Sequence, residues 1–203
     1  EMSRQGWEGQ RKSIDQVDRK LLLGGIPRTA SFSSLTGQNY QQMPQYYDYI
    51  LPKHYYWHRG FDGLYGTVAR WVQRLRKWSP SLTEADCLLV VANLLGIELP
   101  GVANLMDMEH GFPKEFYDEF VFSESKRALE AVGDPDRVVF WVSTGRAPHS
   151  GDPMSARDLH GILSASERAG ARHFLFHPDP YINTAEWRIL SSLCGEEWIE
   201  DTA

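Results

Sequence analysis

The sequence is poor in cysteine, in basic charge and in long apolar runs, and each shortage excludes a class of protein. Only Cys87 and Cys194 occur among 203 residues, each within an apolar helical pattern, so we expect buried thiols in a reducing compartment rather than disulfides or a zinc site. The formal net charge of −6 argues against a nucleic-acid partner, because phosphate binding requires a surplus of Lys and Arg. The one basic run, residues 70–77, has apolar residues at helical spacing and reads as the solvated side of an amphipathic helix.

Targeting and cofactor motifs are also missing. No run approaches the roughly eighteen apolar residues of a membrane span, and nothing at the N-terminus resembles a signal peptide, so we expect a cytoplasmic protein with no membrane partner. The sequence begins with Glu1, which leaves open a processed end or an excised fragment. Gly24-Gly25 is followed by Ile-Pro and not by a helix start, and Ser143-Thr144 lacks a nucleophile-elbow pattern, so we predict no phosphate-bearing cofactor and no serine nucleophile. No other cofactor is predicted.

The composition is that of a globular protein, with 42% hydrophobic and 24% charged residues, and the length suits a single domain over residues 1–203. Four short apolar runs bounded by turn residues predict strands at residues 21–23, 49–51, 138–142 and 174–176. The third run, Val-Val-Phe-Trp-Val, does not alternate, which is typical of a strand buried on both faces of a parallel sheet.

Helical periodicity separates these runs. Helices are predicted at about residues 6–18, 62–77, 81–96, 114–132, 155–170 and 183–195. Ser81 and Glu84 have capping-box spacing before one helix, Asn183 and Glu186 cap another, and Gly96 suits a helix C-terminus. Alternation of strands with helices predicts an α/β fold with parallel neighbours and a helical insertion at about residues 62–132.

In such a sheet the functional groups lie after the C-terminal ends of the strands. The stretch after residue 51 is the richest in aromatic, basic and histidine side chains, and its candidate substrate-binding residues are Lys53, His54, Tyr55, Trp57, His58 and Arg59. Aromatic faces beside hydrogen-bonding groups suit a sugar ring. The alternative is that alternate aromatic residues pack inward as core.

Three further stretches carry candidate groups. Arg146 and Asp152 follow the third strand and can bring a guanidinium and a carboxylate to a substrate oxygen, or form an ion pair that rigidifies the loop. His177, at the end of the fourth strand, suits general acid–base catalysis or a capping bond to the backbone. Glu109, in a segment expected to lie between helices, can serve as acid, base or metal ligand, or belong to a solvated loop.

The sequences at these strand ends show a resemblance to a known family. The segment Asp48-Tyr-Ile-Leu-Pro-Lys-His-Tyr-Tyr-Trp57 with Gly60-Phe-Asp-Gly63, and the segment from Gly170 to His177 with Glu186-Trp187, resemble the later strands of (β/α)8-barrel glycoside hydrolases related to the β-galactosidase and cellulase group. The resemblance implies a partial (β/α)8 barrel of about four strand–helix units, half of a full barrel. It also implies a pair of carboxylates flanking the scissile bond, but the strand that corresponds to the seventh ends in Ser143-Thr-Gly-Arg146, without a glutamate.

These residues are compatible with three functions. The first is a hydrolase of glycosidic bonds, or its C-terminal part, with a carbohydrate substrate, in which Glu109, Asp152 and His177 are the candidate catalytic groups. The second is a sugar-binding or structural half-barrel without catalysis. The third is a metal-dependent barrel hydrolase whose ligands are His54, His58, His177 and Asp179. Because a half-barrel exposes sheet edges, we also expect another chain or a second copy to complete the barrel unless helices protect those edges.

Overall fold

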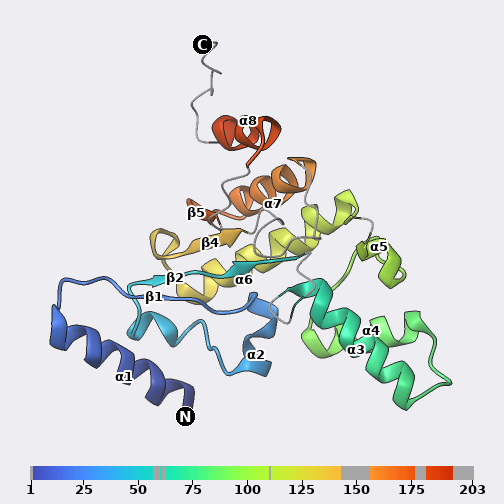
Figure 1. Ribbon diagram of the computed structural model, residues 1–203, viewed down its shortest axis with the longest axis horizontal. Coiled ribbons are helices and arrows are strands. Elements are labelled where there is room, and N and C mark those ends of the chain that lie inside the picture. The colour runs from blue at the N-terminus through green and yellow to red at the C-terminus, as the bar shows by residue number, and fades with distance from the viewer. Residues whose placement is uncertain are drawn as a thin grey trace.

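The chain folds as a mixed α/β protein in which helices pack against small parallel sheets (Figure 1). The structure, a computed structural model, describes residues 2–56, 60, 63–109, 111–142, 156–176 and 182–193. The strands are β1 (Gly24–Gly25), β2 (Tyr49–Ile50), β3 (Lys53–His54), β4 (Val139–Val142) and β5 (His173–Phe176). The longer helices are α1 (Met2–Val17), α3 (Leu64–Trp78), α4 (Glu84–Leu95), α6 (Phe122–Val132), α7 (Ala156–Arg168) and α8 (Thr184–Leu193). The short helical segments are η1 (Ala30–Phe32), α2 (Ser33–Thr36), η2 (Met43–Gln45), α5 (Leu105–Glu109), the π-helical η3 (Phe116–Val121) and η4 (Pro135–Arg137).

The strands are parallel and neighbour one another in the order of the chain. β1 pairs with β2, β3 pairs with β4, and β4 pairs with β5. β2 and β3 are two parts of one extended segment, and a parallel bridge between Ile50 and Val138 joins it to β4 ahead of the β3 pairing. The described residues therefore form a two-stranded and a three-stranded parallel sheet, which this bridge joins into four strand positions in sequential order, and these do not close into a barrel.

Side chains alternate sharply between the two faces of this sheet. Those on the covered face are buried against α6, α7 and η3, and include Ile50, Val138, Phe140 and Val142. Those on the opposite face, such as Val139 and Trp141, are only half-buried. The non-alternating sequence of β4 predicted burial on both faces, but the structure buries this strand fully on one face only, because the described helices pack on that side.

The helices agree with the predicted periodicity but differ in their boundaries. The capping box of α4 is formed by Thr83 and Asp86, not by Ser81 and Glu84, because the Thr83 side chain accepts from the Asp86 N–H while the Asp86 carboxylate accepts from the Thr83 N–H. Gly96 ends α4 with a φ of 63°, as its position predicted. At α8 the predicted pair, Asn183 and Glu186, exchanges both capping bonds.

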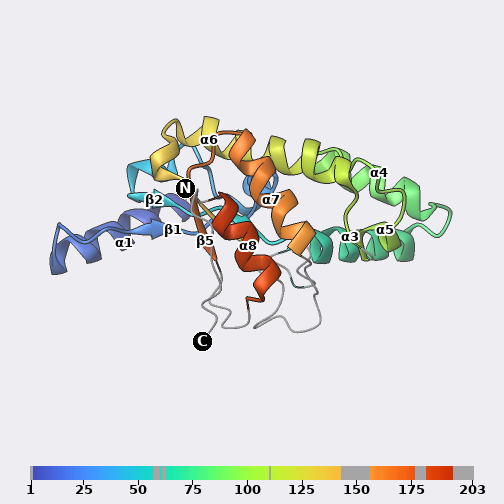
Figure 2. The same cartoon turned by 90° about the horizontal axis from the view of Figure 1, so that it is seen from above.

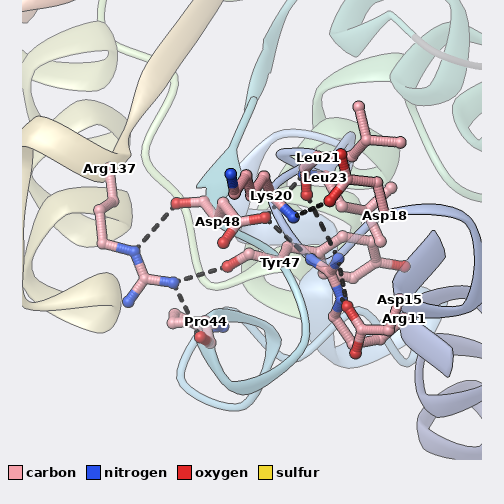
Figure 3. A network of polar contacts seen from close by, with 10 residues as sticks. All are labelled: Arg11, Asp15, Asp18, Lys20, Leu21, Leu23, Pro44, Tyr47, Asp48 and Arg137. Atoms are coloured by element: carbon pink, nitrogen blue, oxygen red, sulfur yellow. Dashed lines mark hydrogen bonds and ion pairs between the residues drawn. The ribbon is translucent and has the colours of Figure 1, made fainter.

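The first strand was predicted three residues too early. Residues 21–23 are not a strand; pairing starts at Gly24 and Gly25, where a side chain would lie 2.8 Å from Leu51 or Tyr47. Figure 3 shows what holds the chain just before it: the Asp48 carboxylate accepts from the Leu23 N–H at 2.7 Å and from Arg11 Nη1 at 2.9 Å. Glycine is uncommon in strands, so propensity alone favoured the leucines.

Only the first part of the predicted insertion, the part that holds α3, α4 and α5, lies at one end of the molecule, whereas α6, which also falls within residues 62–132, packs on the sheet. In Figures 1 and 2, α3, α4 and α5 form a group far from α1, while α6 and α7 lie against the sheet. Cys87 in α4 is fully buried, as predicted, and Cys194 lies outside the described residues. Among the helices that the structure describes, none has the length and apolar character needed to cross a membrane.

Candidate functional site

The parallel strands bring their C-terminal ends to one edge of the sheet, the edge where the sequence predicts the functional groups. Of the predicted residues, Lys53, His54, Tyr55 and Glu109 are described. Seven predicted site residues lie outside the described part of the chain: Trp57, His58, Arg59, Arg146, Asp152, His177 and Asp179.

Lys53 and Trp141 are register partners on the open face of the sheet. Their Cα atoms pair across β3 and β4, and both side chains are half-buried. Lys53 Nζ lies 5.8 Å from the centroid of the Tyr55 ring, and the Tyr55 and Trp141 rings meet edge to face at 6.0 Å. One cation and two aromatic rings thus occupy adjacent positions at the strand ends.

Backbone bonds fix this group in place. The Thr29 hydroxyl donates to the Lys53 carbonyl at 2.8 Å, and the Lys53 N–H donates to the Pro27 carbonyl at 3.2 Å, so β3 is tied to the segment after β1. On the other side, the Trp141 N–H donates to the Pro52 carbonyl at 2.9 Å. The strand ends of β1, β3 and β4 therefore form one hydrogen-bonded unit that sets the positions of Lys53 and Trp141.

The Tyr55 ring is buried in this structure, and its stacking on a ligand stays a prediction. Its side chain is only 5% exposed, so in this structure the ring supports Trp141 and Lys53 and does not present a free face. This is the alternative that the sequence left open, in which an aromatic residue of the triplet packs inward. Trp141, which the sequence analysis treated only as part of a strand, is the more accessible ring.

His54, which the sequence offered as a substrate-binding residue, lies in the core of this structure. It points to the covered face, is 1% exposed, and packs at 4.5 Å from the Phe140 ring and 5.2 Å from the Tyr56 ring. Burial lowers the pKa of His54 to about 3, because the surroundings disfavour the charged form. A neutral core histidine cannot reach a ligand at the open face.

Glu109 is brought to the same edge by the start of α3. The Leu64 N–H donates to the Tyr55 carbonyl at 3.1 Å and the Tyr65 N–H donates to the Tyr56 carbonyl at 3.0 Å, so α3 begins directly beyond β3. The Tyr65 hydroxyl in turn donates to the Glu109 carboxylate. Glu109 is the last residue of the short helix α5, not part of an interhelical loop, and its side chain is exposed.

A buried polar cluster lies beneath the strand ends and was not predicted. The Glu124 carboxylate, 1% exposed, accepts from the Ser31 N–H at 2.8 Å and lies 3.2 Å from Arg127. Burial raises the pKa of Glu124, while Arg127 and Ser31 act in the opposite direction. Burial, with the charge of Glu124 as a smaller cause, also raises the pKa values of Tyr40 and Tyr56. The signal in the sequence was a glutamate on the apolar face of α6, between Phe120 and Ala128.

Arg28 is a second buried group that the sequence analysis missed. It follows β1, its Nη2 donates to the Thr67 hydroxyl at 2.7 Å, and its guanidinium lies 4.0 Å from the centroid of the Phe32 ring. These contacts join the end of β1 to α3. Its position three residues after Gly25, at a strand end, is the feature that could have identified it.

A surface hollow of about 430 Å³ lies on the helical side of the protein. It separates the end of α4 from η3 and α6, and its charged lining residues are Glu98, Glu119, Glu124 and Arg127. None of the predicted site residues lines it. Within the described ranges there is no group of three or more His, Cys, Asp or Glu side chains arranged to hold a metal ion.

Comparison with known proteins gives no relative for this chain: no family model, no curated protein and no solved structure matches it.

Proposed function

We propose that the chain belongs to a carbohydrate-active protein of the (β/α)-barrel type, in which the strand-end edge binds sugar and Glu109 supplies a carboxylate for hydrolysis of a glycosidic bond. The observation that carries the proposal is the register pair of Lys53 and Trp141, half-buried on the open face at the strand ends. An indole face packs on the C–H groups of a sugar ring, and a lysine ammonium donates hydrogen bonds to its hydroxyls.

The order of the strands supports the barrel-type fold. In a (β/α)8 barrel successive strands are neighbours around the sheet, whereas a doubly wound sheet reverses its order at a switch point. Here the four strand positions follow the chain without reversal. In barrels of this kind the functional groups lie at the C-terminal face, where Lys53 of β3 is found.

The proposed role of Glu109 rests on its hydrogen bond from Tyr65. An exposed carboxylate that accepts from a tyrosine hydroxyl is held in one orientation and can act as acid, base or nucleophile. Glycoside hydrolysis uses two carboxylates. Asp152, from the stretch after β4, is the candidate for the second.

Hydrolysis of aryl glycosides tests this role. Glu109→Gln removes the charge and keeps the shape, so we expect loss of at least a hundredfold in kcat, in the range typical of acid–base catalysis. Glu167→Gln is the matched control, because Glu167 is an exposed glutamate near the C-terminus of α7. This end of α7 leads into the start of β5, so Glu167 lies at the opposite edge of the sheet from the strand C-termini. Equal loss in both variants, or full activity of Glu109→Gln, contradicts the proposed role.

A second candidate, a sugar-binding module without catalysis, is favoured by the absence of glutamate in Ser143-Thr-Gly-Arg146. Calorimetric titration with oligosaccharides separates the two candidates. Saturable binding without turnover of any bound sugar supports the module, whereas turnover that depends on Glu109 supports the hydrolase. Absence of both binding and turnover contradicts both.

A further inference from the structure

The basic run of the sequence forms one exposed stripe along α3. Arg70, Arg74, Lys77 and Trp78 stand at positions i, i+4, i+7 and i+8 of this helix, so they follow one another along the same face. All four side chains are exposed, and Trp78 is 74% exposed. These four residues are called the α3 stripe below. They belong to the group of α3, α4 and α5 at one end of the molecule (Figures 1 and 2).

The cations of the α3 stripe are not neutralised by carboxylates of the described chain. Among the described residues, no Asp or Glu lies within ion-pair distance of Arg74 or Lys77. Arg70 donates to a backbone carbonyl of its own helix. By contrast Arg76, on another face of α3, lies 3.6 Å from the Glu84 carboxylate. The stripe therefore keeps its positive charge on the surface of a chain whose net charge is −6.

The stability of the helix does not explain this arrangement. Like charges one turn apart on a helix repel, so Arg70 and Arg74 oppose each other, as do Arg74 and Lys77. The helix dipole favours cations in the last turn, which accounts for Lys77 but not for Arg70 in the middle of α3. The exposed Trp78 ring contributes little burial to the fold. Binding of an anionic partner accounts for all four residues.

The number and setting of the charges select the kind of anion. Proteins that bind DNA through its backbone contact about 6–10 phosphates, whereas the α3 stripe offers three cations on a chain of net negative charge. A helix that lies on a membrane buries its apolar face in the lipid, but Val68 and Val72 of α3 are fully buried within the protein. A short acidic polypeptide needs only a few cations, and arginine binds a carboxylate through two parallel hydrogen bonds.

We propose that the α3 stripe binds an acidic segment of another protein. Arg70 and Arg74 pair with carboxylates one helical turn apart in that segment, and Lys77 adds a third ion pair. Trp78 packs on an apolar side chain that follows the acidic residues, since tryptophan and arginine often dominate the binding energy of protein interfaces. The negative charge of the rest of the chain helps to orient the partner. The proposal does not depend on what the strand ends bind.

Titration with synthetic peptides tests the proposal. The probe is a helical peptide with Glu residues one turn apart on one face and a Leu after the last Glu, and the same peptide with Gln in place of Glu is its control. We expect saturable binding of the Glu peptide at physiological salt, with the largest amide NMR chemical-shift changes at residues 70–78. The Gln peptide should bind at least tenfold more weakly.

Variants of exposed residues locate the binding surface. The double variant Arg74→Glu with Lys77→Glu reverses two charges of the α3 stripe and should weaken binding of the Glu peptide at least tenfold. Trp78→Ala should weaken it at least fivefold. The matched control, Lys12→Glu with Arg19→Glu, makes the same change in net charge at two exposed positions in and just after α1, and should weaken binding less than threefold. Because all five positions are exposed, every variant should keep the native circular dichroism spectrum.

Four outcomes overturn the proposal. Absence of saturable binding of the Glu peptide up to millimolar concentration shows that the stripe is only the solvated side of α3. Equal binding of the Gln peptide shows that carboxylates are not recognised. Equal weakening by the stripe variant and the control variant shows that only the net charge of the protein matters. Tighter binding of oligothymidine or of phosphatidylserine vesicles than of the Glu peptide identifies a nucleic acid or a lipid surface as the partner.

Discussion

The carboxylate of Glu124 accepts a hydrogen bond from the backbone N–H of Ser31 at 2.8 Å, and these two residues are 93 positions apart in the sequence. The bond joins the first turn of α6 to the short helix after β1, and both partners are buried. It therefore links two buried segments of the protein that are distant in the sequence.

Removal of this carboxylate tests its role in stability. Glu124→Ala leaves the Ser31 N–H without its acceptor, and we expect a loss of about 3 kcal/mol in the free energy of unfolding.

Glu124→Gln keeps an acceptor oxygen and removes the charge. Since burial raises the pKa of Glu124, the folded state binds the proton more tightly than the unfolded state. The stability of the native protein relative to the Gln variant should therefore fall as pH rises above about 4.5, measured by urea unfolding at several pH values. An increase over that range contradicts the assignment.

His54 predicts a pH dependence of the opposite sign. Its pKa is about 3 in the folded protein, against an ordinary value of 6.5, so the unfolded state binds the proton more readily. The stability associated with neutral His54 is complete above pH 6.5 and falls by about 1.4 kcal/mol per pH unit as pH decreases toward 3. His54→Phe fits the ring site beside Phe140 and should flatten this slope in urea titrations. His160→Phe, at an exposed histidine, should not; equal slopes in all three proteins argue against a buried neutral His54.

These buried polar groups belong to the features of the structure that no local sequence pattern predicts. Hydrophobic periodicity and capping residues predicted the helices, because an amphipathic stripe, or a capping box such as that of Asn183 and Glu186, is a local pattern in the sequence. The burial of His54 and the partial exposure of Lys53 depend on which face of the two-residue strand β3 each side chain takes, and the register with β4 decides this. No local pattern contains that register, so the sequence could not predict which of these side chains face the core, or that Trp141 lies beside Lys53.

Gly161 lies where α7 approaches an aromatic ring. A Cβ atom at this position would lie 2.7 Å from the Tyr117 ring, so we expect Gly161→Ala to destabilise the protein by about 1–3 kcal/mol in spite of its better helix propensity. Gly6 in α1 has no atom within 4 Å of the corresponding position. Gly6→Ala should therefore stabilise the protein by about 0.5–1 kcal/mol. Thermal unfolding of the two variants should shift in opposite directions; shifts of the same sign disagree with this packing.

Arg137 anchors the turn before β2 to the start of β4. Its guanidinium donates to three backbone carbonyls, those of Asp48 at 3.0 Å, Pro44 at 2.8 Å and Tyr47 at 2.6 Å (Figure 3). A lysine cannot reproduce this fork, so Arg137→Lys should lose about 2 kcal/mol of unfolding free energy in urea. Arg172→Lys is the control, because Arg172 forms an exposed ion pair. Comparable losses in the two variants would show that the fork geometry is unimportant.

The pair of Lys53 and Trp141 is the centre of the functional account, and equilibrium binding tests it most directly. Calorimetric titration of the purified chain with a panel of neutral oligosaccharides should detect saturable binding of at least one. Lys53→Met and Trp141→Ala should each weaken that binding at least tenfold, which corresponds to about 1.4 kcal/mol. Lys126→Met, at an exposed lysine of α6, should leave it unchanged. Absence of binding by every sugar, or binding that neither strand-end variant weakens, would contradict the account.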